Sequence, residues 1–400
     1  MKKLLLTFAV LLAMPMLAQQ ALFDQNNLTS PEVNADGTVT FRLFAPKAVT
    51  AEVTGDFLPE GQSSAAMKEG QGGVWTYTTP ALPPEMYSYR FRVNGMDVLD
   101  PSNVYRCRDI ASFQNIFIVS REEGDCGSLY SVNRVPHGNV SKVWYDSPTL
   151  QTRRRMTVYT PAGYDRGGRY PVLYLLHGAG GDEDAWTTLG CAAEILDNLI
   201  ASGKAKPMIV VMPNGNANCE AAPGEWKPEG QPSAMYKPSF MGHAMSKPVA
   251  STEESFKDIV NFVDKNYRTI AKKQSRAICG LSMGGGHSFG ISKLYPDLFN
   301  YVGLFSAAVS LNARGFDGLG DRNQQIAPEV EQQLATLFTK KKPALYWIAI
   351  GKTDFLYNQN KVYREYLDSK GYAYEYVESE GGHIWRNWRV YLTQFAQRLF

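Results

Sequence analysis

The chain has 400 residues, of which 44% are hydrophobic and 20% are charged, and its formal net charge is +2. This composition is ordinary for a globular protein, and the length favours two or three domains. No long run of one charge sign occurs, so nothing indicates binding to nucleic acid or to an anionic membrane surface.

The N-terminus has the pattern of an export signal. Lys2 and Lys3 precede an apolar stretch from Leu4 to Leu12, and Ala18 offers a small residue for cleavage. This predicts a signal peptide over residues 1–18. No later stretch reaches the roughly 18 apolar residues of a membrane span. We therefore expect an exported protein without a membrane anchor; the signal does not separate periplasm from extracellular space.

Residues 21–120 are predicted to form a small all-β sandwich. Short runs with alternating apolar residues are separated by turn signals, as expected for strands that bury one face. The runs are Thr38–Phe44, Ala51–Thr54, Val74–Tyr77 and Tyr87–Val93. The polar stretch 121–139 is broken by Gly and Pro and is predicted to be a linker.

Strands and helices alternate over residues 140–400, which predicts an α/β domain with a mostly parallel sheet. Pro171–His177 is a continuous apolar run, as expected for a strand buried on both faces. Arg155–Tyr159 is predicted to be an edge strand, and Ser255–Tyr267 an amphipathic helix. Further strands are predicted over Lys206–Pro213, Arg276–Gly280, Val302–Phe305, Ala344–Gly351 and Tyr372–Val377.

A nucleophile motif, G-x-S-x-G, occupies Gly280–Gly284, with Ser282 at its centre. It follows a predicted strand and opens a predicted helix, Gly285–Leu294, which is the context that the motif requires. Side chains at the two glycine positions would crowd so tight a turn. Ser282 is therefore predicted to be an exposed nucleophile at a helix N-terminus.

A serine needs a base and an acid to become a nucleophile, and these follow in the order Ser, acid, His. His383 alone among the five histidines fits the last position, because the others lie at 137, 177, 243 and 287. Asp354 directly follows the predicted strand Ala344–Gly351 and is the favoured acid. Other aspartates in helix or loop settings between the serine and the histidine compete with it: Asp297, Asp317, Asp321 and Asp368.

The oxyanion hole requires two N–H groups. We expect one from Met283, which follows the nucleophile, and one from Gly178 or Ala179 in the loop after an early strand. His177 is expected to shape that loop rather than to transfer protons.

The long polar loop 214–251 is expected to line the acyl pocket, with Trp226 and Trp385 as substrate-binding residues. The five cysteines match no zinc spacing, and neither a metal nor an organic cofactor is expected.

From about residue 140 onward the chain resembles family-one carbohydrate esterases, which are α/β-hydrolases. The resemblance rests on Arg154–Pro161, Tyr174–Gly178, Asn266–Arg268, Gly280–Gly285 and Gly382–Trp385. It implies a Ser-Asp-His triad at Ser282, Asp354 and His383.

Residues 21–120 resemble the immunoglobulin-like modules of carbohydrate-binding family 48. The matching features are Phe41–Pro46, Gly55–Phe57, Gly73–Trp75 and Asp100–Pro101. Sugar binding by this module stays open, because Trp75 fits a core position at least as well as a sugar-stacking one.

The combined pattern predicts a feruloyl esterase that acts on feruloylated arabinoxylan or its oligosaccharides. Acetylated xylan and a siderophore ester are alternative substrates. A glycan-binding protein with an inactive hydrolase domain is an alternative of another class, although retention of every triad member argues against it.

Overall fold

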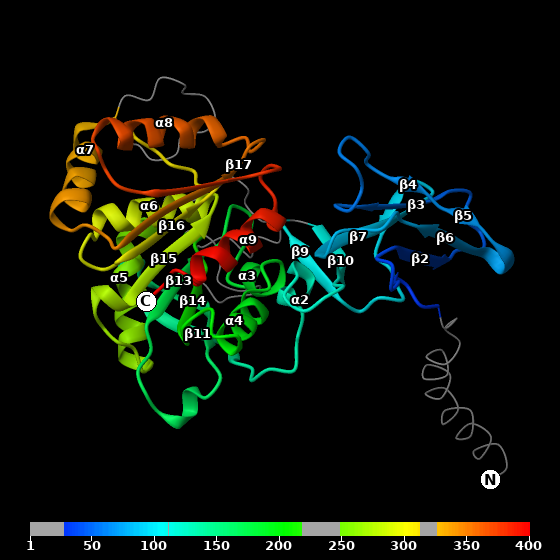
Figure 1. Ribbon diagram of the computed structural model, residues 1–400, viewed down its shortest axis with the longest axis horizontal. Coiled ribbons are helices and arrows are strands. Elements are labelled where there is room, and N and C mark those ends of the chain that lie inside the picture. The colour runs from blue at the N-terminus through cyan, green and yellow to red at the C-terminus, as the bar shows by residue number, and fades with distance from the viewer. Residues whose placement is uncertain (1–27, 111, 218–248, 313–325) are drawn as a thin grey trace, which may run out of the picture. The chain divides into compact units, whose positions relative to one another are not determined.

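The computed structural model describes residues 28–110, 112–217, 249–312 and 326–400 (Figure 1). The expected signal peptide at 1–18 and Trp226 both lie outside these residues. No helix in the described ranges is long and apolar enough to cross a membrane. The chain divides into two compact units, the first comprising residues 1–106 and 114–121 and the second 107–113 and 122–400.

Over its described residues, the first unit contains two β-sheets. One has the strand order β1-β2-β6-β5, and the other has the order β4-β3-β7-β10-β9, with β8 paired to β7. The strands are β1 (Glu32–Val33), β2 (Val39–Phe44), β3 (Ala51–Gly55), β4 (Ala65–Ala66), β5 (Lys68–Glu69), β6 (Val74–Thr78), β7 (Glu85–Val93), β8 (Met96–Val98), β9 (Arg106–Asp109) and β10 (Ser112–Val119).

Alternating side chains from both sheets form the core of this unit. Phe41, Tyr89 and Phe117 are buried and in ring contact, with centroids 4.8 to 5.7 Å apart. Trp75 belongs to this core: it is 7% exposed, and its indole N–H donates to the carbonyl of Ala45 at 3.0 Å. Its position is structural, and its ring is not available for stacking on a sugar.

The unit boundaries differ from the predicted ones in two places. Residues 107–113, predicted to be part of the sandwich, group with the second unit. The stretch 121–139 is not a separate linker, because residues from 122 onward belong to the second unit and include helix α2 (Cys126–Tyr130). Asn198 holds this stretch, donating to the carbonyls of Leu129 at 2.9 Å and Ser131 at 3.0 Å.

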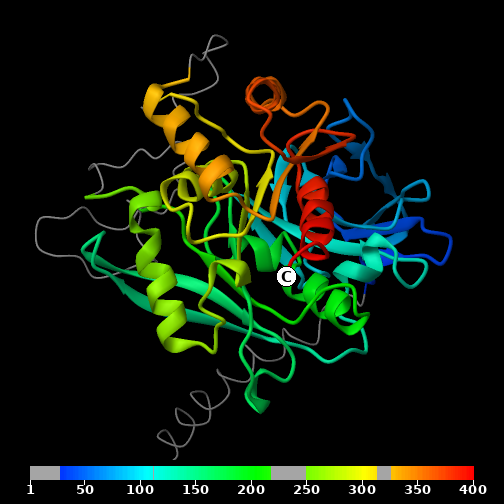
Figure 2. The same ribbon diagram turned by 60° about the vertical axis from the view of Figure 1, so that its left-hand side comes forward.

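The second unit is built on an eight-stranded sheet, counted over the described residues, with the order β11-β12-β14-β13-β15-β16-β17-β18. Figure 2 shows helices of this unit around the sheet, with the C-terminal helix in red. The strands from β14 to β18 in this order are parallel, and β11 and β12 are antiparallel additions. The strands are β11 (Asn139–Ser147), β12 (Thr152–Thr160), β13 (Val172–Leu176), β14 (Ile209–Pro213), β15 (Arg276–Leu281), β16 (Tyr301–Phe305), β17 (Leu345–Gly351) and β18 (Glu375–Ser379).

The prediction that Arg155–Tyr159 is the edge strand is wrong. This segment lies in β12, and β11 pairs along its full length and forms the edge. Most side chains of β11 are exposed, as is usual for an edge strand, so it lacks the apolar run of the inner strands.

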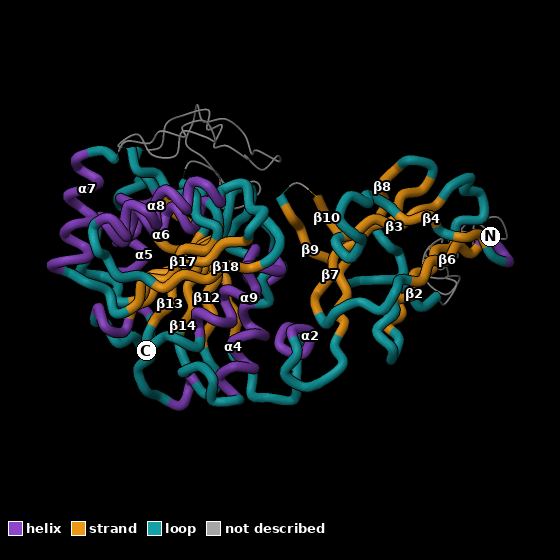
Figure 3. Tube along the Cα trace, turned by 45° about the horizontal axis from the view of Figure 1, so that its top comes forward, coloured by secondary structure: helices purple, strands orange, loops and turns teal. Residues whose placement is uncertain are grey.

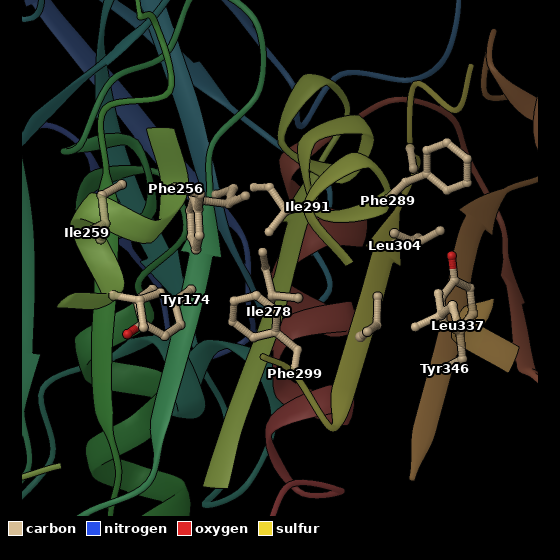
Figure 4. Packing of buried hydrophobic residues seen from close by; sticks show 14 of the residues in the cluster. Tyr174, Phe256, Ile259, Ile278, Phe289, Ile291, Phe299, Leu304, Leu337 and Tyr346 are labelled. Atoms are coloured by element: carbon tan, nitrogen blue, oxygen red, sulfur yellow. The ribbon is translucent and has the colours of Figure 1, made fainter. Parts of the chain in front are cut away.

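Helices cover both faces of the sheet, as Figure 3 shows. One face packs against α5, α6, α7 and α8, in a core that includes Tyr174, Phe256, Ile278, Phe289 and Leu304 (Figure 4). On the other face, Phe305 and Trp347 contact Tyr391 and Phe395 of α9. The helices are α3 (Ala185–Thr188), α4 (Ala192–Ala201), α5 (Thr252–Asn266), α6 (Met283–Leu294), α7 (Pro328–Ala335), α8 (Tyr357–Ser369) and α9 (Trp385–Ala396). This arrangement confirms the predicted α/β-hydrolase fold preceded by a β-sandwich.

A capping box fixes the start of α5. The Ser251 hydroxyl accepts from the backbone N–H of Glu254 at 3.1 Å, and the Glu254 carboxylate accepts from the N–H of Ser251 at 2.8 Å. We expect Ser251→Ala to lower the free energy of unfolding by about 1 kcal/mol, because one helical N–H loses its partner. Urea unfolding measures this. Ser251→Asn, which retains a capping oxygen, should stay near the wild type, and equal losses in both variants would contradict the capping role.

Candidate active site

Ser282 lies in a strained turn between β15 and α6. Its backbone has φ 53° and ψ −115°, a conformation that few non-glycine residues adopt. Backbone bonds hold the turn: the N–H of Ser282 donates to Phe305 at 2.9 Å, and its carbonyl accepts from Ala308 at 3.0 Å. The strand–turn–helix context predicted for the motif is therefore present, with Ser282 at its apex.

Two glycines allow this turn to form. A Cβ atom at Gly280 would lie 2.5 Å from the carbonyl oxygen of Gly284. A Cβ at Gly284 would lie 2.5 Å from the carbonyl oxygens of both Leu176 and His177. These backbone oxygens cannot move away by a change of rotamer. Any side chain at either position would therefore push α6 away from the sheet.

Asp354 and His383 form a direct pair. Asp354 follows β17, and His383 follows β18, so both extend from the carboxyl ends of neighbouring parallel strands. His383 Nδ1 lies 2.9 and 3.0 Å from the two carboxylate oxygens of Asp354. The Asp354 side chain is fully buried and also accepts from the N–H of Leu356 at 2.8 Å. Of the competing aspartates, Asp317 and Asp321 lie outside the described residues.

This pairing sets the tautomer of His383. A carboxylate accepts only, so Nδ1 carries the proton and Nε2 has the lone pair that can accept one. Ring contacts restrict the imidazole further, with centroids 4.3 Å from Phe355 and 4.9 Å from Trp388. The arrangement suits a general base whose orientation is set before substrate binds.

Asn387 holds the histidine loop, a role that the sequence analysis missed. From the first turn of α9, its amide donates to the carbonyls of Glu380 at 3.1 Å and Gly382 at 2.9 Å. The side chain is 7% exposed. The only sequence signal was its place four residues after His383, which does not by itself reveal a bond to the backbone.

The predicted oxyanion loop, Gly178–Gly181, follows β13 and lies beside Ser282, the predicted nucleophile. A Cβ at Gly178 would approach the Cβ of Ser282 to 3.3 Å. Met283 is the first residue of α6, so its N–H is one of the donors that a helix leaves without an intrahelical partner. The structure thus places two of the predicted oxyanion residues, Gly178 and Met283, next to Ser282.

His177 shapes this loop, as predicted. It is 2% exposed; Nε2 accepts from the N–H of Gly215 at 2.8 Å, and Nδ1 lies 2.8 Å from the carbonyl of Gly178. Because Nε2 is an acceptor, Nδ1 carries the proton and donates. Burial lowers the pKa of His177 to about 4, so the ring is neutral at pH 7. A proton-transfer role at that pH does not fit these bonds.

The two arginines of the Arg154–Pro161 motif support the same region. Arg154 donates to the carbonyl of Asn216 at 2.8 Å, and Arg155 forms an ion pair with the buried Glu183. Asn214 donates to Glu183 at 2.9 Å, and Asn216 donates to the carbonyl of Gly181 at 2.9 Å. The motif therefore ties the first residues of the long loop to the oxyanion loop.

Trp385, predicted to bind substrate, is half-buried at the start of α9. Its ring packs edge-to-face on Trp186 and Trp388, with centroids 5.3 and 5.2 Å away. Trp388 in turn contacts His383. Phe355, which the sequence analysis missed, is 57% exposed and contacts the same histidine. An exposed aromatic ring thus lies beside the candidate base.

His287 pairs with a different carboxylate. Its Nδ1 lies 2.6 Å from Glu253, at the start of α5. Burial alone would raise the pKa of Glu253, but the charge and hydrogen bond of His287 lower it to about 2. The partner of His287 is therefore Glu253, whereas Asp354 pairs with His383. Within the described ranges, no group of three or more His, Cys, Asp or Glu side chains is arranged to hold a metal ion.

Residues 147–399 match the model of the family described as "Putative esterase". This chain belongs to that esterase family. Residues 29–104 match carbohydrate-binding module 48, the isoamylase N-terminal domain. Both matches confirm the predicted resemblances and coincide with the fold of each unit.

Curated relatives of this esterase include an endo-1,4-beta-xylanase/feruloyl esterase of Xylanibacter ruminicola. It is 30% identical over 381 residues, which are 92% of this chain and 46% of that protein. The chain thus spans less than half the length of that relative. An acetyl esterase of Caldicellulosiruptor saccharolyticus is 27% identical over 56% of this chain and 80% of its own length.

Solved structures show the same fold. A ferulic acid esterase, 27% identical, superposes with a TM-score of 0.51 over 67% of this chain and 100% of its own. The enterobactin esterase of Shigella flexneri, 14% identical, gives a TM-score of 0.58 over 90% of this chain and 92% of its own. The second likeness, at this identity, concerns the fold alone.

The buried His177 makes stability depend on pH. Its pKa falls from 6.5 when unfolded to about 4 when folded, so the unfolded chain binds the proton more readily. The contribution of His177 to the free energy of unfolding is fully present above pH 6.5. It is lost as the pH falls toward 4, which lowers the free energy of unfolding by about 3 kcal/mol. Urea unfolding between pH 7 and pH 4 should show a smaller loss for His177→Gln. The same loss in both proteins would contradict this assignment.

Proposed function

We propose that this esterase is a serine hydrolase of hydroxycinnamoyl esters, such as feruloyl esters, on plant xylan. The observation that carries the proposal is the pair between buried Asp354 and His383 at the sheet edge where Ser282 is presented. This is the acid–base part of a serine acyl-transfer site.

The reaction has two steps. The Ser282 hydroxyl attacks the ester carbonyl while His383 Nε2 takes its proton, and Asp354 stabilises the resulting imidazolium. The N–H of Met283 and one from the Gly178–Ala179 stretch stabilise the oxyanion. The protonated His383 then gives its proton to the leaving alcohol. Water attacks the acyl-enzyme by the same route and releases the acid and free Ser282.

The aromatic surroundings of His383 support an aromatic acyl group. Phe355 is exposed beside the imidazole, and Trp385 lies two residues after it in the sequence. An exposed flat ring beside the proposed base favours stacking of a phenolic acid. The xylanase/feruloyl esterase relative and the match to a carbohydrate-binding module support a carbohydrate ester as substrate.

An acetyl ester is the second candidate substrate, favoured by the acetyl esterase among the relatives. The proposal also includes export to the periplasm or the extracellular space, supported by the basic and apolar pattern of residues 1–18. Feruloylated arabinoxylan is a polymer outside the cell, so an exported enzyme would have access to this substrate.

Methyl ferulate and methyl acetate share a leaving alcohol and therefore report the acyl preference. We expect kcat/KM to be at least about ten-fold higher for the ferulate, because burying an aromatic acyl group contributes more than a methyl group. Ser282→Ala should abolish turnover, a loss of about a million-fold in kcat. The change in ferulate absorbance measures hydrolysis of methyl ferulate, and release of methanol measures hydrolysis of both esters.

Ser292→Ala is the matched control, because Ser292 is buried in the same helix and donates to the carbonyl of Phe289 at 3.0 Å. It should keep full activity. Turnover of acetate alone would overturn the acyl assignment and leave the serine mechanism. Xylan binding without hydrolysis of any ester would overturn the proposed activity and favour a glycan-binding protein.

A further inference from the structure

Cys107–Phe113 groups with the second unit, although it includes most of β9 and the first two residues of β10. Three consecutive residues of this segment, Arg108, Asp109 and Ile110, contact loops of the active site. None of them belongs to the elbow, the acid–histidine pair or the oxyanion donors. Their contacts fall on the oxyanion loop and on the aromatic cluster next to His383. The proposed reaction requires both to have a fixed position.

Arg108 holds the oxyanion loop. One guanidinium nitrogen donates to the carbonyl of Gly180 at 3.3 Å and to that of Ile110 at 2.5 Å. The other forms an ion pair with Asp182. Both side chains are 30% exposed, so the pair is only partly screened by solvent. The planar fork of arginine suits such simultaneous contacts.

Ile110 contacts the same loop. Gly180 has φ +76°, which favours glycine, and a Cβ atom there would lie 2.9 Å from Cγ2 of Ile110. The loop is therefore in close contact with Ile110 and bonded to Arg108. Gly180 is next to Ala179, one of the predicted oxyanion residues, so displacement of Gly180 would displace the donors.

Asp109 holds the aromatic cluster. Its carboxylate accepts a hydrogen bond from the side chain of Trp385, whose indole N–H is a donor only. Asp109 is half-buried, and this partial burial raises the pKa of its carboxyl group. Trp385 packs on Trp388, and Trp388 packs on His383. A single hydrogen bond therefore fixes the outer ring of a stack that ends at the candidate base.

We propose that Arg108 and Asp109 are positioning residues for the ester hydrolysis: Arg108 fixes the oxyanion loop through Gly180 and Asp182, and Asp109 fixes Trp385 against Trp388, which contacts the histidine. This inference rests on the proposed function. The two residues act on different quantities. Oxyanion donors matter most in the transition state, so Arg108 governs kcat. Trp385 is offered as an acyl-contacting ring, so Asp109 governs KM for aromatic esters.

Arg108→Ala should lower kcat for methyl ferulate by about 10- to 100-fold with little change in KM, because a displacement of about 1 Å can cost that much. Arg108→Lys keeps the charge without the fork and should show a smaller loss. Arg153→Ala is the control: it removes an arginine–aspartate pair, with Asp146, whose side chains are 69% and 81% exposed. It should match the wild type.

A folded Arg108→Ala with kcat within two-fold of the wild type would overturn the role of Arg108. Thermal unfolding establishes whether that variant is folded. If it is not, Arg108→Lys decides, and full kcat in that variant overturns the role.

Asp109→Ala should raise KM for methyl ferulate several-fold and leave KM for methyl acetate unchanged, because only the aromatic acyl group uses Trp385. Asp109→Asn keeps an acceptor oxygen and should restore the wild-type KM. Equal changes for both esters, or no rescue by asparagine, would overturn the role of Asp109.

A phosphorylating probe separates failure of this inference from failure of the proposed function. Diethyl 4-nitrophenyl phosphate transfers its phosphoryl group to an activated serine and releases 4-nitrophenolate, whatever the acyl preference. If the wild type reacts with the probe but does not cleave methyl ferulate, the proposed substrate is wrong. The probe rate of Arg108→Ala still tests the loop: a slower rate supports its positioning, and an unchanged rate overturns it.

Discussion

Helix α6 lies against the end of β13 at backbone contact distance, and the other parts of the active site depend on this approach. It requires glycine at 280 and 284, because a Cβ at either position would meet backbone atoms 2.5 Å away. The approach forces Ser282 into its positive-φ turn and brings it beside Gly178 of the neighbouring loop. One steric constraint thus positions both the proposed nucleophile and the proposed oxyanion loop.

The proposed base, His383, depends on a second, electrostatic constraint. Asp354 is buried, and a buried carboxylate is stable only when hydrogen bonds satisfy it. The N–H of Leu356 and Nδ1 of His383 supply them. Its partner histidine is in turn held by Asn387 through the loop backbone and by Trp388 and Phe355 through ring contacts. Parallel β17 and β18 bring these groups together because their carboxyl ends share an edge.

The sequence predicts the elements that are marked by a short motif or by a continuous apolar run. The elbow, the inner strands and the order of Ser282, Asp354 and His383 all follow from short motifs and apolar runs. The edge strand β11 was missed because most of its side chains face solvent. The roles of Arg154, Asn387 and Arg108 were missed because each bonds to backbone far away or in a loop, and periodicity carries no information about such partners.

In the proposed reaction, Ser282 forms a covalent acyl-enzyme. Mixing the protein with excess methyl ferulate, quenching in acid within milliseconds and digesting it allows mass spectrometry to locate the acyl group. We expect a feruloyl adduct on the peptide that contains Ser282 and no adduct when Ser282→Ala is treated in the same way. Ferulate release with no adduct, or an adduct on another residue, would contradict it.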